Sequence, residues 1–115
     1  KERGVMADYN DYLPDVKRYD EAADEAAVKG IVKHLGIALQ SKTADSALVS
    51  ASDKSELDRV RDSWLKKKLA RTESDVELDA AVKAVAETMK GDNRKQRVTF
   101  YYLLAKNYGV LDSLH

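Results

Sequence analysis

The sequence predicts an all-α fold: a compact, single-domain bundle of about five helices around a central C-terminal helix. Apolar residues recur at helical spacing in successive segments of the chain. One proline and five glycines among 115 residues, with 35% charged residues, are typical of a soluble helical protein. The stretch from Val98 to Leu104 is apolar almost all the way round a helix, as expected for a buried central helix.

The N-terminal half begins with the predicted domain start at Met6. Residues 1–5 are interpreted as a disordered start or an expression remnant, and residues 6–115 as one α-helical domain. Asp11 is the expected cap of a short helix with Pro14 in its first turn. A second helix is expected from about Asp20, ending or bending at Gly36. The apolar stripes of these helices are Tyr12, Val16 and Tyr19, then Val28, Ile31, Val32, Leu35 and Leu39.

Two further helices follow a connection of small residues at 41–52, in which Leu48 and Val49 are the expected anchors. Asp53 with Glu56 is interpreted as the capping pair of the third helix. Thr72 is the expected cap of the fourth helix and Gly91 its end. Their stripes are Leu57, Val60, Trp64, Leu65 and Leu69, then Leu78, Val82, Val85 and Met89.

The last helix carries the candidate site. Asn93 and Gln96 fit a capping box, which would place Arg94, Lys95 and Arg97 in the first turn. Cations there are unfavourable by about 0.3–1 kcal/mol each when exposed, because they lie at the positive end of the helix dipole. We therefore predict a negative group nearby, either Asp92 and the acidic segment from Asp8 to Glu25 or an external anion or acidic partner surface.

Charge is segregated along a chain whose net charge is zero. Residues 1–25 hold eight acids and four bases, a charge of −4, and residues 72–89 hold five acids and one base, also −4. Residues 53–71 hold seven bases and four acids, +3, and residues 90–106 hold five bases and one acid, +4. This pattern favours electrostatic contacts between segments or with a partner.

The sequence predicts no catalytic residue, no cofactor and no metal ligand. It holds no cysteine and none of the glycine-rich loops that bind phosphates. His34 and His115 have no second histidine at helical spacing, and the abundant carboxylates fit helix caps and polar faces. An enzyme with a helical pocket that lacks any linear motif is kept as an alternative.

These observations favour a small non-enzymatic binding or protein-interaction module in the cytoplasm. The partner would be another protein or a second copy of the chain. No apolar run approaches the length of about 20 residues that spans a membrane. An alternative is a nucleic-acid-associated protein, which the zero net charge disfavours. The basic residues that would contact the nucleic acid are Arg59, Lys66 to Lys68, Arg71, Arg94, Lys95 and Arg97.

Five segments, in order, resemble a known family. They are "DYLPDVKRYD", "IVKHLGIAL", "ELDRVRDSWLKKKL", "TESDVELDAAV" and "RVTFYYLLAKNYG". The stretch from Met6 to Leu111 is similar to the bacterial domain of unknown function 2853. The resemblance implies a small α-helical protein in a bacterial cytoplasm, and it implies no activity or site residue.

Overall fold

The computed structural model describes residues 8–39 and 47–115. Residues 1–5 and the first half of the predicted 41–52 connection lie outside the described residues. The elements in chain order are η1 (Tyr9–Asp11), α1 (Leu13–Lys17), α2 (Glu25–Leu35), η2 (Gly36–Leu39), β1 (Leu48–Val49), α3 (Lys54–Val60), η4 (Arg61–Lys68), α4 (Asp75–Thr88), β2 (Lys95–Gln96), α5 (Arg97–Asn107) and η5 (Leu111–Leu114). The η elements are 3₁₀-helices, except η4, which is a π-helix that continues α3.

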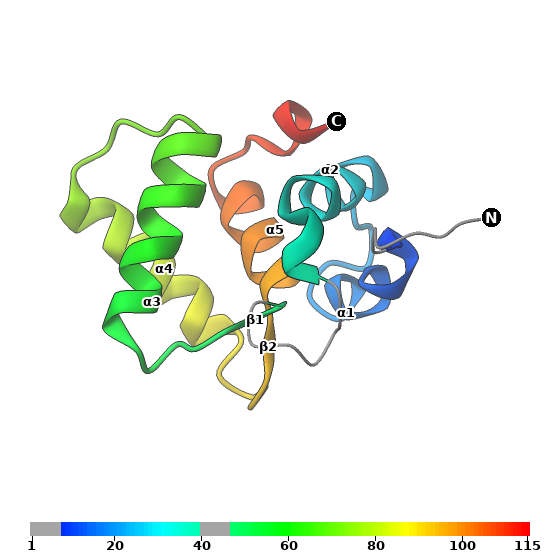
Figure 1. The fold of residues 1–115 in the computed structure, drawn as a ribbon, viewed down its shortest axis with the longest axis horizontal. Helices are drawn as coiled ribbons and strands as arrows, with labels where there is room; N and C mark the ends of the chain where they lie inside the picture. Colours follow the sequence, from blue (N-terminus) through cyan, green and yellow to red (C-terminus); the bar gives the residue numbers. More distant parts are fainter. Residues whose placement is uncertain (1–7, 40–46) are drawn as a thin grey trace.

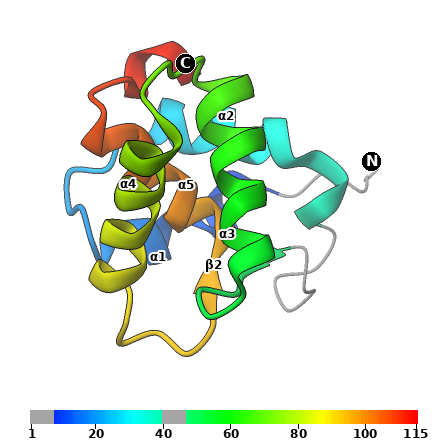
Figure 2. The ribbon, with the colours of Figure 1, turned by 90° about the vertical axis from the view of Figure 1, so that its left-hand side faces the viewer.

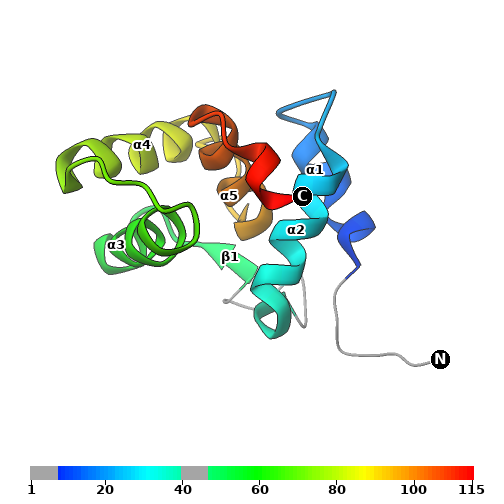
Figure 3. The same ribbon diagram turned by 90° about the horizontal axis from the view of Figure 1, so that it is seen from above.

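Helix α5 runs through the middle of the molecule, with α3 and α4 on one side and α1 and α2 on the other (Figure 1, Figure 3). All eight residues from Val98 to Ala105 are buried. Trp64 of η4 stacks on Tyr101 at 4.5 Å between ring centroids, and its indole nitrogen donates to the Tyr101 carbonyl oxygen at 3.1 Å. The predicted all-α bundle around a central C-terminal helix is therefore confirmed.

The N-terminal helices start at residues other than those predicted. Asp11 does not cap the helix that holds Pro14: it lies in η1, whose cap is Asp8, and Tyr12 at the start of α1 makes no side-chain cap bond. Asp24 rather than Asp20 caps α2, because the Asp24 side chain accepts a hydrogen bond from the Ala27 N–H. Asp20 instead accepts from the Tyr102 hydroxyl of α5 at 2.7 Å. Gly36 ends α2 with a φ of +50°, a conformation that favours glycine, as the sequence indicates.

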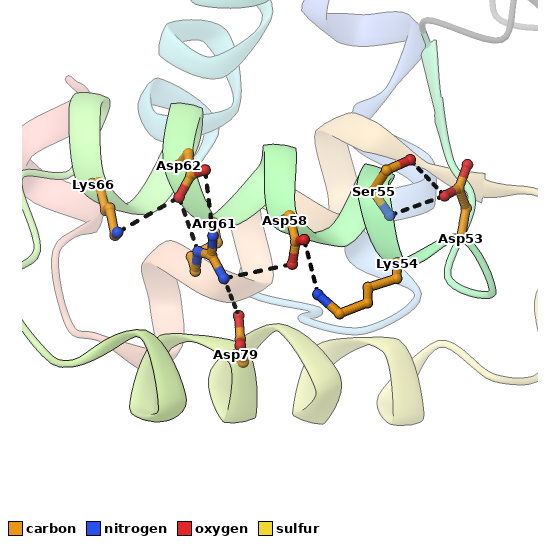
Figure 4. Close-up of polar contacts among 8 residues, drawn as sticks. All are labelled: Asp53, Lys54, Ser55, Asp58, Arg61, Asp62, Lys66 and Asp79. Atoms are coloured by element: carbon orange, nitrogen blue, oxygen red, sulfur yellow. Dashed lines mark hydrogen bonds and ion pairs between the residues drawn. The ribbon is translucent and has the colours of Figure 1, made fainter.

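Helices α3 and α4 lie side by side in front of α5 in Figure 2. Arg61 joins them, since one of its nitrogens donates to Asp79 of α4 at 3.0 Å and another to Asp62 at 2.9 Å (Figure 4). The stripe of α4 is buried as predicted, but its cap is Ser74 rather than Thr72. Ser74 and Glu77 form a full capping box, whereas Thr72 has no Glu or Gln three residues later.

A two-stranded antiparallel ribbon is the main departure from the predicted helices. Leu48 pairs with Gln96, and Val49 with Lys95, so these anchors lie in a strand rather than a turn. The pairing holds Lys95 and Gln96 extended, and α5 consequently starts at Arg97 with no side-chain cap. The predicted Asn93–Gln96 capping box is therefore wrong. Instead, the Gln96 side-chain oxygen is buried and has no hydrogen-bond partner within the described residues.

Gly30 is required where η5 crosses α2. A β-carbon at this position would lie 1.9 Å from the Leu114 carbonyl oxygen. Helix propensity alone predicts that Gly30→Ala stabilises the protein by about 1 kcal/mol. We expect the clash to reverse that sign and to lower the free energy of unfolding by about 1–3 kcal/mol, measured by urea denaturation. Gly91→Ala is the matched control, because a β-carbon at Gly91 would meet nothing within 4 Å. A stability gain for both variants would contradict the close packing of η5.

Candidate functional site

The predicted site residues line one open cleft of about 760 Å³. The cleft lies beside the β1–β2 ribbon, whose strands are labelled in Figure 1. It lies between the end of α2, the ribbon, α3 and the start of α5. Its described lining holds the cations Arg59, Arg94, Lys95 and Arg97 and the carboxylates Asp53 and Glu56. Its apolar lining comes from Leu35, Leu48, Val49 and Tyr101. The three predicted cations thus face the same cleft, although only Arg97 belongs to the first turn of α5.

Arg97 turns from the start of α5 into the interior, where its side chain is only 11% exposed. Its guanidinium donates to the Leu48 carbonyl oxygen at 2.8 Å, to the Tyr101 hydroxyl at 3.2 Å and to the Glu56 carboxylate. Burial acts to lower the pKa of Arg97, but its contacts with Tyr101 and Glu56 outweigh this effect and raise the pKa. Arg97 therefore stays charged and ties α5 to α3 and β1.

Glu56 is the cleft residue whose place the sequence interpretation missed. Its predicted role in capping α3 is wrong: Asp53 alone caps the helix, and the Asp53 N–H donates to the Ser50 carbonyl oxygen at 3.2 Å. Glu56 is 7% exposed and binds both Arg97 and Arg59, the latter at 3.1 Å. Glu56 lies one helical turn before Val60 on the apolar face of the helix, and this position was the signal that could have indicated its burial.

The acidic N-terminal segment contacts α5 through carboxylates that accept hydrogen bonds from hydroxyl groups of the helix. Asp15 accepts a hydrogen bond from Thr99, and Asp20 accepts one from Tyr102. For Arg97 the structure shows Glu56 as the carboxylate partner, where the sequence predicted a carboxylate among the first 25 residues.

The Asp92 carboxylate does not form its ion pair with Lys95, although the nearby Lys95 charge helps to lower the Asp92 pKa. It pairs instead with Arg18 at 2.6 Å and accepts from the Tyr19 hydroxyl at 2.5 Å. These contacts hold the pKa of Asp92 below its usual value, and burial with this bond raises the pKa of Tyr19 to about 12. Lys95 donates to the backbone carbonyl oxygen of Asp92 at 2.8 Å.

A comparison with known protein families gives a match over nearly the whole chain. The family model described as "Protein of unknown function (DUF2853)" matches residues 11–112. The chain belongs to this family. No curated protein matches it. In the part of the chain that the structure describes, no helix has the length and apolar character needed to cross a membrane.

In this member of the family, the basic residues of the nucleic-acid alternative do not form one stripe. Arg59, Arg94, Lys95 and Arg97 line the cleft, whereas the others lie farther along η4 and beyond its end. Lys66 pairs with Asp75 at 2.6 Å. Arg71 pairs with Glu73 and lies 4.5 Å over the Tyr108 ring. Much of this basic charge is therefore balanced by neighbouring acids.

His34 lies in the last turn of α2, and His115 directly follows η5. The His34 ring lies 5.4 Å from Trp64, and burial together with the charge of Lys68 lowers its pKa. His115 contacts Asp24 at 2.6 Å, a bond that raises the histidine pKa. With Asp112, these two residues bring three potential metal-ligand atoms within 4.8 Å of one another. The fold thus creates a grouping that sequence spacing does not reveal, although Asp112 and His115 are exposed.

Proposed function

We propose that this protein is a non-enzymatic, cytoplasmic binding module that takes up an acidic segment of a partner protein in the cleft beside the β1–β2 ribbon. The observation that carries the proposal is that Arg59 of α3 meets Arg94, Lys95 and Arg97 of a single short run at one cleft. The described lining has a formal charge of +2, from four bases and two acids. A partner with carboxylates would complement that charge.

The apolar part of the lining favours a peptide. Leu35, Leu48, Val49 and Tyr101 line the same cleft as the cations, so the cleft offers contacts for both carboxylates and apolar side chains. A volume of about 760 Å³ is large enough for several side chains of an extended segment. A nucleic acid would favour a continuous basic stripe, and here Lys66 and Arg71 are already paired with acids.

The charged groups of the cleft suit binding rather than acid–base catalysis. Hydrogen bonds from Ser55 and neighbouring N–H groups lower the pKa of Asp53, while the pKa of Arg97 is raised. Both shifts favour the charged form, so neither group exchanges a proton readily near neutral pH. Asp53 and Arg97 therefore keep constant charges.

Binding of a fluorescently labelled hexaglutamate peptide, followed by fluorescence anisotropy at about 0.15 M salt, tests the proposal. We expect Arg94→Gln with Lys95→Gln to weaken binding about tenfold or more, because charge-assisted contacts are lost. Arg97 is left intact because it also holds the interior together.

The matched control is Lys17→Gln with Lys83→Gln, which removes the same charge from exposed positions outside the lining of the cleft. Equal weakening by both double variants would show nonspecific attraction and overturn the proposal. Tighter binding of a DNA or RNA duplex than of the peptide under the same conditions would favour the nucleic-acid alternative instead.

A further inference from the structure

A second groove, of about 550 Å³, lies on the other side of α2, against the end of η4 and η5. In Figure 3 these three elements surround one end of α5. The groove is lined by Lys29 and Lys33 of α2, Lys68 of η4 and His34. It shares no described lining residue with the cleft beside the ribbon.

The three lysines of this groove form no ion pair with another described residue. Lys29 and Lys33 are four residues apart on one helix face, and Lys68 approaches from a different element. No acidic side chain is found among the described residues that line the groove. Within residues 8–39 and 47–115, the ion pairs involve other cations, such as Lys66 with Asp75, Lys54 with Asp58 and Lys106 with Asp20.

Collecting like charges in this way costs stability. Like charges four residues apart on a helix destabilise it, and Lys68 adds to the repulsion. The charge of Lys68 also contributes to the lowered pKa of His34, after the effect of burial, which indicates that the two groups are close. An anion in the groove would relieve this repulsion.

The backbone positions the lysines firmly. Gly30 lets η5 cross α2 with direct backbone contact, which closes one side of the groove. The π-helical bond from the Leu69 N–H to the Trp64 carbonyl oxygen, 2.8 Å long, sets the last turn of η4 that carries Lys68. Trp64 is fully buried and packs against His34, so the turn and α2 are fixed relative to each other.

We propose that this groove binds a small soluble anion that carries phosphate groups, held by Lys29, Lys33 and Lys68. A phosphate group has close to two negative charges and several acceptor oxygens, so it can satisfy ammonium groups that approach from two elements. Asp24 and Asp112 lie around His115 at the edge of the groove. These acids disfavour a long polyanion such as a nucleic acid, which would have to pass over them.

Isothermal titration calorimetry with inorganic pyrophosphate at constant ionic strength tests this site. We expect saturable binding to the wild type and about tenfold weaker binding to Lys33→Gln and to Lys68→Gln. Lys67→Gln is the matched control, because it removes the same charge from the adjacent exposed residue, which does not line the groove. Its affinity should equal that of the wild type.

Absence of saturable binding, or equal weakening by Lys67→Gln and Lys68→Gln, would overturn the proposal. The Lys68→Gln variant should bind the hexaglutamate peptide as the wild type does, because it leaves the cleft beside the ribbon unchanged. Loss of peptide binding in this variant would contradict the separation of the two sites. The outcome for pyrophosphate is thus independent of the outcome for the peptide.

Discussion

Glu56→Ala is expected to lower the free energy of unfolding by about 3–5 kcal/mol. The substitution leaves Arg97 charged and largely enclosed, with a side chain that is only 11% exposed. Its hydrogen bonds to the Leu48 carbonyl oxygen and to the Tyr101 hydroxyl are made to neutral groups, which do not replace the charge of Glu56. Urea denaturation followed by circular dichroism measures the change.

A double variant separates loss of the pair from loss of packing. Glu56→Met with Arg97→Met removes both charges, so we expect it to be more stable than Glu56→Met alone. Lys54→Ala is the control for an exposed pair, because the Lys54 side chain is 86% exposed in its contact with Asp58, and we expect no measurable change. A loss below about 1 kcal/mol for Glu56→Ala would show that solvent screens the buried pair.

Leu104→Ala is expected to cost about 2–5 kcal/mol of stability, the range for removing a large buried aliphatic side chain. Leu104 is fully buried in α5, where the helices on both sides pack against the same segment. The space left behind cannot be filled by moving one helix, because α5 is enclosed from several directions (Figure 1).

Val76→Ala provides the comparison, since Val76 is 79% exposed at the start of α4. We expect its stability to match that of the wild type in the same urea denaturation experiment. A loss of less than about 1 kcal/mol for Leu104→Ala would contradict the central position of α5.

The candidate site was predictable in composition but not in geometry. Arg94, Lys95 and Arg97 stand out in the sequence because three cations cluster near an expected helix start. Their local pattern fits a capping box, but pairing with Leu48 and Val49 holds Lys95 and Gln96 extended. Strand pairing between distant segments leaves little trace in so short a run, whereas a capping box is a local signal.

Glu56 illustrates a second limit. The spacing of Asp53 and Glu56 fits a cap, and nothing in the neighbouring sequence indicates that Arg97 is the partner. An ion pair between α3 and α5 depends on how the two helices pack, and that packing is decided by the whole core. The same reason applies to the grouping of Lys29, Lys33 and Lys68, which come from two helical segments far apart in the chain.

The sequence by itself determined the all-α class, the buried stripes of α2, α3 and α4, and the central place of α5. These features follow from the spacing of apolar residues, which acts locally and survives any rearrangement of the loops. Only the tertiary structure decided the start of α5 and the partner of Arg97. It also decided the cleft beside the β1–β2 ribbon and the groove lined by Lys29, Lys33 and Lys68. Those features depend on contacts between segments distant in sequence, and such contacts form only once the helices are packed around α5.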